Sequence, residues 1–412
     1  MSGRRLLTCP WIVAALLLVV SPQASCAVPP GSGTTVVVRF VDGTSAQGGL
    51  VTMDGQTLSL VVDPATSVHD LADVIAIEVG DPLKAADPTA DRWVLLAGGD
   101  RAPLSPFDLV DDHLVCRRAG ADRRADWRVP LQFVTSVLYQ PLVSRGASSH
   151  VPELSFRKFG EDTLILRDGT RLTGVLEDLS TESIRIETAV GAVSVEVERV
   201  DAIALDSALV QQPDAGPTSA LLMTRDGAWL TLHAWSVNAD SELEGRTHVD
   251  TEFRIPLADV ARIACYGPRV VDLTTRTIAD TQVTPFVSRV EGMLINRNVR
   301  GGFLGLDDRE YARGFGMTSG MSATFPLEPE DRQFRAIVGL DDMVGNEGSV
   351  VFTVDVDGRR VYTSPLVTGA DPAIVVGPLE IAGGKQMTLS VEFAEYGNVQ
   401  DVANWSDPVI LR

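Results

Sequence analysis

One stretch decides the fold of the last third of this 412-residue chain: Val350-Val351-Phe352-Thr353-Val354-Asp355-Val356-Asp357-Gly358-Arg359-Arg360-Val361-Tyr362. Its apolar side chains recur at every second residue, which is the period of a β-strand with one buried face. Asp357-Gly358 separates two strand-like runs and can adopt the positive φ of a tight hairpin turn. The segment Thr388-Leu389-Ser390-Val391-Glu392-Phe393 alternates in the same way. The sequence therefore predicts a two-sheet β-sandwich over residues 285–412.

Four blocks follow one another in and around this stretch: Tyr311-Ala312-Arg313-Gly314-Phe315-Gly316, residues 334–342, residues 350–364, and Asp401-Val402-Ala403-Asn404-Trp405. In this order they resemble the NPCBM family of carbohydrate-binding modules, and the resemblance covers roughly residues 305–412. That family is similar to the galactose-binding-like β-sandwiches, or jelly rolls, and is found in exported bacterial proteins, including glycoside hydrolases. The resemblance implies a sugar-binding sandwich with no catalytic residues of its own.

Sugar sites usually combine a flat apolar ring with carboxylates, amides or arginines that bond to hydroxyl groups. These residue types give the candidate carbohydrate-binding set: Tyr311, Arg313, Phe315, Asp341, Asp342, Tyr396, Asn398, Asp401, Asn404 and Trp405. Phe315 and Trp405 could instead fill the core, and Asp341 could accept from backbone N–H groups of a tight loop. Family members often carry histidine where Met317 and Val402 stand, so contacts made by those histidines do not transfer to this chain.

Catalytic and metal chemistry find little support in the sequence. The adjacent carboxylates Asp341-Asp342 could hold a structural calcium ion together with backbone carbonyls, and no other cofactor is expected. No two of the five histidines have the spacing of zinc ligands on one element. The motifs of a nucleophile elbow or a phosphate-binding loop are absent from the sequence, and small β modules seldom enclose a sugar-cleaving cleft. We therefore predict a protein that is not an enzyme.

The preceding two thirds contain an internal repeat. Asp42-Gly43-Thr44 returns 126 residues later as Asp168-Gly169-Thr170, and Pro130 returns as Pro256 at the same offset. Each half contains two similar pieces, so the chain carries four closing segments with an aliphatic residue at the first, fourth and seventh positions. These segments are residues 71–77, 131–137, 197–203 and 257–263.

Pieces of this size with short alternating strands are typical of small β-barrels. We predict an all-β chain with four SH3-like or Sm-like barrel units in tandem, one pair at residues 35–140 and the other at 162–266, each pair packing as a unit. In the second piece, Asp100-Arg101 stands where the fourth piece has Asp226-Gly227. Gly98-Gly99 precedes it, so the turn glycine has moved upstream.

The formal net charge of −20 argues against a nucleic-acid partner, because lysine and arginine supply most of the affinity for phosphates. At the N-terminus, two arginines precede an apolar run that is too short for a stable transmembrane helix, and small residues follow it. Residues 1–27 are therefore predicted to be a signal peptide cleaved after Ala27, which places the protein in the periplasm or outside the cell. Acylation of Cys26 is the alternative, although Gln23 replaces the aliphatic residue that a lipoprotein signal requires. Cys116 and Cys265 could form a disulfide or could be two buried thiols.

Three functions stay open at this point. The first is an exported, non-catalytic carbohydrate-binding protein whose partner is a polysaccharide or glycan. The second is a cell-envelope scaffold or protein-interaction module in which the sandwich is structural and the partner is an envelope protein. The third is an accessory chain of a glycoside hydrolase system.

Overall fold

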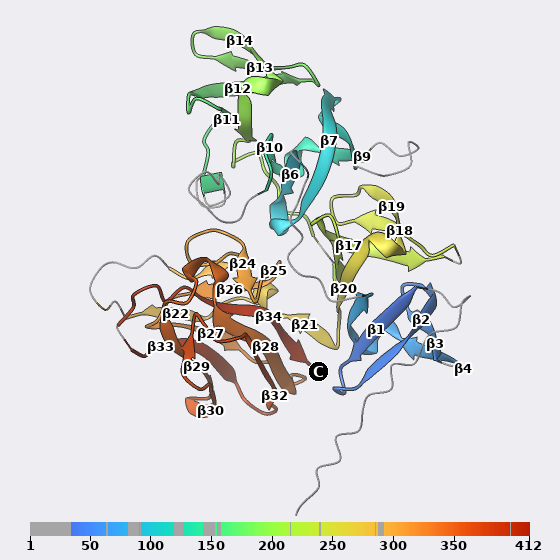
Figure 1. The fold of residues 1–412 in the computed structure, drawn as a ribbon, viewed down its shortest axis with the longest axis vertical. Helices are drawn as coiled ribbons and strands as arrows, with labels where there is room; N and C mark the ends of the chain where they lie inside the picture. The colour runs from blue at the N-terminus through green and yellow to red at the C-terminus, as the bar shows by residue number, and fades with distance from the viewer. Residues whose placement is uncertain are drawn as a thin grey trace, which may run out of the picture.

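The computed structural model describes residues 34–62, 65–80, 90, 92–118, 127–142, 153–154, 158–214, 216–238, 240–284, 286, 292–395 and 397–412. The predicted signal peptide, including Cys26, lies outside these ranges. The named elements are β-strands and short 3-10 turns, so the predicted all-β class is confirmed (Figure 1). Within the described ranges, no helix is long and apolar enough to cross a membrane.

Four small units of five strands each precede the sandwich. The first unit contains β1 (Thr35–Phe40), β2 (Ser45–Met53), β3 (Thr57–Val62), β4 (Ala65–Asp70) and β5 (Val74–Val79). The second contains β6 (Trp93–Leu96), β7 (Arg101–Val110), β8 (His113–Arg118), β9 (Trp127–Pro130) and β10 (Val134–Leu138). The third contains β11 (Asp162–Leu166), β12 (Arg171–Leu179), β13 (Ser183–Thr188), β14 (Gly191–Glu196) and β15 (Val200–Ala204). The fourth contains β16 (Ser219–Thr224), β17 (Trp229–Val237), β18 (Glu242–Thr247), β19 (Glu252–Pro256) and β20 (Val260–Tyr266).

Each closing segment is a 3-10 turn followed by the last strand of its unit. The turns are η1 (Leu71–Asp73), η3 (Leu131–Phe133), η4 (Val197–Arg199) and η5 (Leu257–Asp259). The aliphatic residues at the fourth and seventh positions of all four segments are buried, because they are the residues of the last strand that face the unit's core. The pattern of three aliphatic positions therefore marks the same structural element four times.

The hydrogen bonds of the first turn show that the second unit aligns with the fourth differently from the alignment predicted from the sequence. In the fourth unit the N–H of Thr224 donates to the carbonyl of Ala228, whereas in the second unit Leu96 donates to Asp100. Gly98-Gly99, with φ of 83° and 93°, therefore occupies the turn that Asp226-Gly227 forms in the fourth unit. Asp100 aligns with Ala228 rather than with Asp226, because the register of this turn is shifted by two residues.

The four units pair in a nested order rather than along the chain. β5 of the first unit pairs antiparallel with β20 of the fourth, and β10 of the second pairs with β15 of the third. Figure 1 shows the first unit beside the fourth. Our expectation that consecutive units would pack as pairs is thus not what the strand pairing shows. The last strand of each unit pairs with the unit's first strand along one edge, which leaves its other edge open, and two such edges satisfy each other's backbone groups.

The last third forms a sandwich of two sheets, in the order β23-β26-β34-β28-β32, with β21 on β34, and β22-β27-β33-β29-β30, with β31 on β29. One sheet contains β21 (Val270–Asp272), β23 (Leu294–Ile295), β26 (Gly314–Met317), β28 (Gln333–Leu340), β32 (Ile374–Glu380) and β34 (Ala403–Leu411). The other contains β22 (Asp280–Val283), β27 (Met321–Pro326), β29 (Ser349–Val356), β30 (Arg359–Thr363), β31 (Val367–Thr368) and β33 (Gln386–Phe393). A separate hairpin joins β24 (Leu304–Leu306) and β25 (Arg309–Tyr311).

The hairpin predicted at Asp357-Gly358 is present, with φ of 51° and 76° at these two residues. Val350, Phe352 and Val354 on β29 are fully buried between the sheets, as their alternation predicts. Because β21 and β22 already belong to the two sheets, the sandwich begins before the expected residue 285.

Cys116 and Cys265 are both buried, and they are not joined to each other. The Cys116 thiol lies 3.7 Å from the carbonyl oxygen of Trp127. Burial raises the pKa of Cys265 to about 12. The structure therefore agrees with the second of the two alternatives, in which both residues fill the core as small apolar side chains.

Candidate functional site

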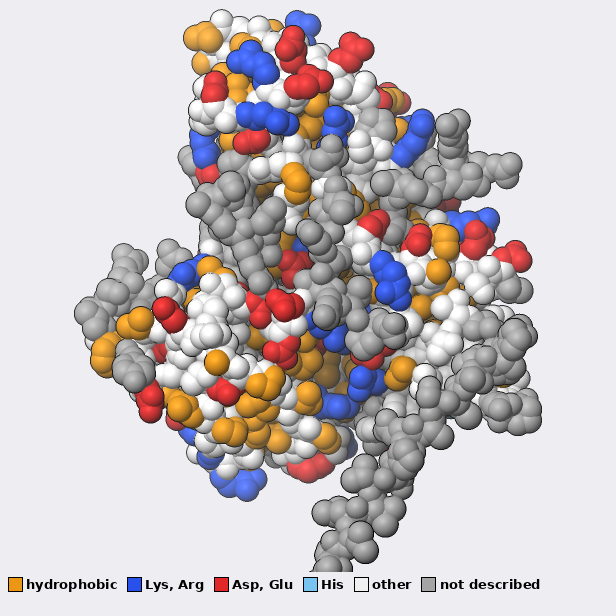
Figure 2. All heavy atoms as spheres, in the orientation of Figure 1, with side chains coloured by type: hydrophobic (Ala, Val, Ile, Leu, Met, Phe, Trp, Pro, Cys, Tyr) orange, Lys and Arg blue, Asp and Glu red, His pale blue; other side chains and the backbone are white. Residues whose placement is uncertain are grey.

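A cleft of about 330 Å³ lies where the first and fourth barrel units meet the sandwich. The barrel side of the cleft comes from β1, β5 and β20, and the sandwich side comes from the β24–β25 hairpin and from β28, β32 and β34. Figure 2 shows a hollow between the two parts of the molecule, with both basic and acidic side chains along its sides. The volume of this cleft falls within the range of small-ligand sites.

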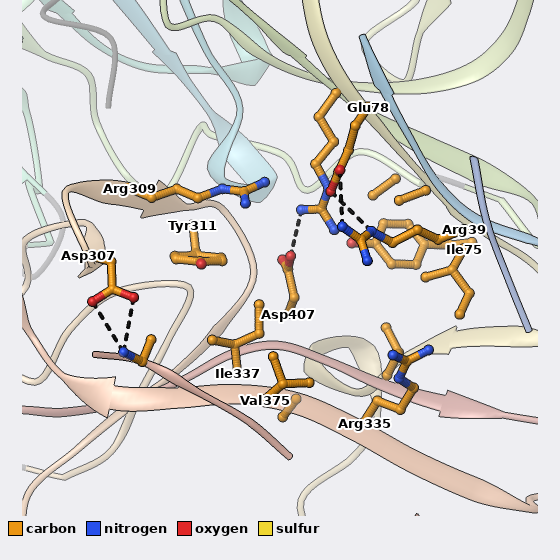
Figure 3. Close-up of a pocket in the computed structure, with 17 residues that line it drawn as sticks. Arg39, Ile75, Glu78, Asp307, Arg309, Tyr311, Arg335, Ile337, Val375 and Asp407 are labelled. Atoms are coloured by element: carbon orange, nitrogen blue, oxygen red, sulfur yellow. Dashed lines mark hydrogen bonds and ion pairs between the residues drawn. The ribbon is translucent and has the colours of Figure 1, made fainter. Parts of the chain in front are cut away.

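Tyr311 and Arg309 enter the cleft from the β24–β25 hairpin (Figure 3). The hairpin turn at Asp307 and Asp308 has positive φ at both residues, a conformation that Asp adopts more readily than most residues. The guanidinium carbon of Arg309 lies 5.5 Å from the centre of the Tyr311 ring. Burial raises the pKa of Tyr311 to about 12, so its hydroxyl stays protonated and can donate a hydrogen bond. The hairpin thus places a cation beside a buried tyrosine, which keeps only 4% of its surface exposed.

Carboxylates in the cleft are engaged by neighbouring groups. Glu78 lies 3.2 Å from Arg39, and Asp407 lies 2.5 Å from Arg262. The Asp307 carboxylate accepts from the backbone N–H of Ala373 at 3.0 Å (Figure 3). These contacts fix the polar rim of the cleft.

Arg335 reaches the cleft from β28, on the side opposite to Arg309 (Figure 3). Burial lowers the pKa of Arg335 below its ordinary value, and the positive charge of Arg39 lowers it further. The guanidinium stays charged at any pH at which the protein is folded, because arginine is protonated far above neutral pH. Two like charges therefore face each other across part of the cleft.

Arg313, a predicted site residue, lies in the interface with the barrel units instead. Its guanidinium donates to the carbonyl of Gly98 at 3.0 Å and to Oγ1 of Thr231 at 2.9 Å. Asp272 lies 3.3 Å away. Burial alone would lower the pKa of Arg313, but the nearby carboxylates, Asp272 first among them, raise it overall. Because its donors are used for contacts within the protein, Arg313 holds the barrel units against the sandwich.

Phe315, Asn404 and Trp405 are completely buried in the sandwich and have no surface to offer a ligand. Trp405 packs edge-on against Phe352, with ring centres 5.4 Å apart. The positions where family members often carry histidine, Met317 and Val402, are buried as well. Phe315 and Trp405 therefore fill the core, which was the alternative to a role in ligand binding.

Asp341 is surrounded by hydrogen-bond donors. Its carboxylate accepts from the side-chain amides of Asn298 and Asn404 and from the N–H groups of Gly305 and Met343. Burial raises its pKa, which these donors oppose. The carboxylate thus joins the β24–β25 hairpin to the core sheet.

Three further members of the candidate set, Asp342, Asn398 and Asp401, lie in segments between the strands of the sandwich. Asp342 accepts from the N–H of Asp308 at 3.1 Å, and the buried Asp401 accepts from the N–H of Ser349 at 2.9 Å. Asn398 is half-buried, and Tyr396 lies outside the described residues. No group of three His, Cys, Asp or Glu side chains suited to a metal ion occurs in the part of the chain that is described, so calcium stays a prediction.

Among the described candidates, Tyr311 is the one that lines the cleft, and its neighbours there were not in the predicted set. Arg309 could have been found from its position two residues before Tyr311, because residues i and i+2 of a β-strand share one face. Arg39, Glu78 and Arg335 carry no such signal, because they belong to other strands and meet Tyr311 only when the two parts of the chain pack together.

Comparisons with known proteins concern the sandwich above all. The NPCBM/NEW2 domain model matches residues 276–411. A protein of Renibacterium salmoninarum named "Putative endo-alpha-N-acetylgalactosaminidase" is 28% identical over 101 residues, which are 24% of this chain and 7% of that protein. This chain therefore matches only a small part of that curated relative.

Two solved structures from Clostridium perfringens are also similar. The CBM51 module of GH95, solved with methyl-galactose, is 20% identical over 34% of this chain and 99% of that one, with a TM-score of 0.31. The structure of CBM51-2 with the INT domains of ZmpB, solved with GlcNAc, is 20% identical over 42% of this chain and 36% of that one, with a TM-score of 0.32. The family predicted from the sequence blocks is thus the one whose model matches, and residues 276–411 are an NPCBM/NEW2 domain.

Proposed function

We propose that this chain is an exported, non-catalytic protein that binds a polysaccharide or glycan. The observation that carries the proposal is the NPCBM/NEW2 domain over residues 276–411. The basic and apolar pattern of residues 1–27 supports export, because it has the order of a cleavable signal peptide.

The cleft beside Tyr311 is the site that best suits a sugar. A pyranose ring presents apolar C–H groups to an aromatic side chain and hydroxyl groups to charged or amide partners. Tyr311 is only 4% exposed, so Ile337 and the exposed Val375 provide the accessible apolar surface, while Glu78, Arg309 and Asp407 provide polar groups within the same cleft. The proposal therefore places the ligand between the barrel units and the sandwich.

The state of the carboxylates supports a binding role over hydrolysis. A glycosidase needs one carboxyl group as proton donor and a second as base or nucleophile. In the cleft, Glu78 and Asp407 are each held by an arginine, and Asp307 is held by a backbone N–H. These contacts occupy carboxylate oxygens that a proton donor or nucleophile would have to present to the sugar.

A structural role in the cell envelope is the second candidate. It is favoured by the use of Arg313, which bonds Gly98 and Thr231 of the barrel units rather than facing solvent. In that case the sandwich would brace the repeats, and the repeats would contact an envelope partner.

Affinity electrophoresis and glycan arrays with the full chain test the first proposal. We expect retention by at least one polysaccharide and loss of retention in Val375→Trp, because this exposed residue lines the cleft and a larger side chain would fill it. Val175→Trp is the matched control, since Val175 on β12 is similarly exposed and far from the cleft.

Folded protein that no polysaccharide retains would refute carbohydrate binding. If that protein still co-sedimented with isolated cell envelopes, the structural role would replace carbohydrate binding as the proposed function. Equal retention of both tryptophan variants would leave the protein a glycan binder but would move its site away from the cleft.

A further inference from the structure

We infer that the cleft between the barrel units and the sandwich selects an acidic saccharide, one that carries a carboxylate or a sulfate group. The inference rests on the proposed function and names the class of glycan that this site takes.

The first reason is the balance of charge in the cleft. Each carboxylate there has a partner, as described above for Glu78, Asp307 and Asp407. Arg309 and Arg335, by contrast, have no carboxylate within ion-pair distance among the described residues that surround them. The cleft thus holds two guanidinium groups whose charge is not neutralised locally.

The second reason is that the chain as a whole is strongly acidic, with a formal net charge of −20. In a chain with so many more acidic than basic residues, arginines without a carboxylate partner would not be expected to gather in one cleft by chance. Arg335 and Arg39 also lie close enough for the charge of one to lower the pKa of the other. An anion placed between them would relieve this repulsion, and arginine binds carboxylate and sulfate groups with paired N–H donors.

The third reason distinguishes a sugar from a bare anion. The apolar side chains of Ile337 and Val375 line the sandwich side of the cleft, and Val375 is exposed. A simple anion gains nothing from such a surface, whereas the C–H face of an acidic sugar would cover it. The charged and apolar parts of the cleft together match the two faces of one ligand.

The site is also shared between the two parts of the chain. Arg39 comes from β1 of the first barrel unit, whereas Arg309 and Arg335 come from the sandwich. The NPCBM/NEW2 domain alone would therefore present only part of the site, and the repeats would complete it.

The test compares each acidic polysaccharide with its own neutral form. Alginate, polygalacturonate, hyaluronan and heparin are offered to the full chain, beside carboxyl-reduced or desulfated preparations of the same polymers. Poly-glutamate and inorganic sulfate are offered as anions without a sugar. We expect at least one acidic polymer to bind ten times or more tightly than its neutral form, and sodium chloride to weaken that binding.

Three single variants test whether the two arginines are responsible. Arg309→Gln and Arg335→Gln are each expected to weaken binding of the acidic polymer by about tenfold or more, since hydrogen bonds to charged groups are the stronger ones. Arg359→Gln on β30 removes the same charge from an exposed position outside the cleft and is expected to bind as the wild type does. Circular dichroism and the urea midpoint of each variant establish that it is folded.

Each remaining result counts against the inference in its own way. Binding to neutral polymers with no preference for the acidic form would overturn it and leave the proposed function in place. Equal binding of poly-glutamate would replace the sugar with an acidic peptide, and equal losses in all three variants would deny a role to the cleft. Failure of the folded chain to bind any saccharide would remove the proposed function as well.

Discussion

Arg101 of the second barrel unit donates from Nη2 to Oε2 of Glu310 in the sandwich at 2.5 Å. The guanidinium carbon also lies 3.5 Å from the centre of the Trp229 ring. Burial lowers the pKa of Arg101, and the charge of Glu310 opposes this. The pair is thus a charged contact beside the rings of Trp229 and Phe303, and it joins the barrel units to the hairpin that carries Tyr311.

Removing Glu310 should destabilise this interface. Glu310→Ala leaves the buried charge of Arg101 without its carboxylate partner, and breaking a buried ion pair from one side costs about 3 to 5 kcal/mol. Because Glu310 is partly exposed, we expect the lower end of that range in urea unfolding. Glu330→Ala, at an exposed position of the sandwich, is the control. An unchanged free energy of unfolding for Glu310→Ala would show that water replaces the carboxylate as the partner of the Arg101 guanidinium.

The role of Trp405 as a core residue predicts a large loss of stability. Trp405→Ala should lower the free energy of unfolding by about 3 to 5 kcal/mol, since it empties space between the two sheets. Trp405→Phe should cost less, because the indole Nε1 has no hydrogen-bond partner to lose within the described structure. Glycan binding by the folded Phe variant should match the wild type. A variant of wild-type stability that no longer binds glycan would instead place this ring at the ligand.

Local features were predictable from the sequence because neighbouring residues determine them. The alternation before Asp357-Gly358 and the turn residues themselves fix a hairpin without help from the rest of the chain. The three aliphatic positions of each closing segment likewise identified the same element in all four units. For Trp405 the sequence left core packing and ligand contact open, and its complete burial settles where the side chain lies.

Contacts between segments that lie far apart in the chain could not be predicted from the sequence. The pairing of β5 with β20 depends on two strand edges meeting in space, and offset repeats do not say which units will meet. The meeting of Arg39 with Arg335 in one cleft depends on that same packing. The shift at Gly98-Gly99 was visible as a displaced glycine, but its effect, the alignment of Asp100 with Ala228, required the hydrogen bonds of the turn.

The Gly-Phe-Gly entrance of the sandwich makes a stability prediction. A Cβ on Gly316 would lie 2.3 Å from the carbonyl oxygen of Arg297 and 2.5 Å from the Cα of Asn298. Both contacts are with backbone, which cannot move aside as a side chain can. Gly316→Ala should therefore lower the free energy of unfolding by about 1 to 3 kcal/mol, as overpacking does.

Gly292→Ala is the control for this substitution. A Cβ there meets nothing within 4 Å, so the urea midpoint should stay unchanged. Equal stability of the two alanine variants would mean that the backbone at Arg297 and Asn298 can move to make room for the added methyl group without loss of stability. A loss confined to Gly316→Ala would show that the family motif is kept here for backbone packing.

Asp100 makes the stability of the interface depend on pH. Its carboxylate lies 3.1 Å from Nε2 of His248 and accepts from Oγ1 of Thr231 at 2.8 Å. Burial alone would raise the pKa of Asp100, but the hydrogen bond and charge of His248, together with the charge of Arg313, lower it overall. A carboxylate whose pKa is lower in the folded state contributes stability above its ordinary pKa of 3.8 and loses it as the pH falls.

Comparing wild type with Asp100→Asn in urea unfolding at pH 6 and at pH 3 tests this linkage. At pH 6 the variant should be less stable by about 3 kcal/mol, because it leaves the buried charge of Arg313 without its nearby carboxylate. The difference should shrink at pH 3, where protonation of the wild-type carboxylate begins to remove the same contribution. Asp240→Asn, at an exposed position, should follow the wild type at both pH values. A difference that stays constant from pH 6 to pH 3 would mean that the role of Asp100 is one of shape and hydrogen bonding rather than of charge.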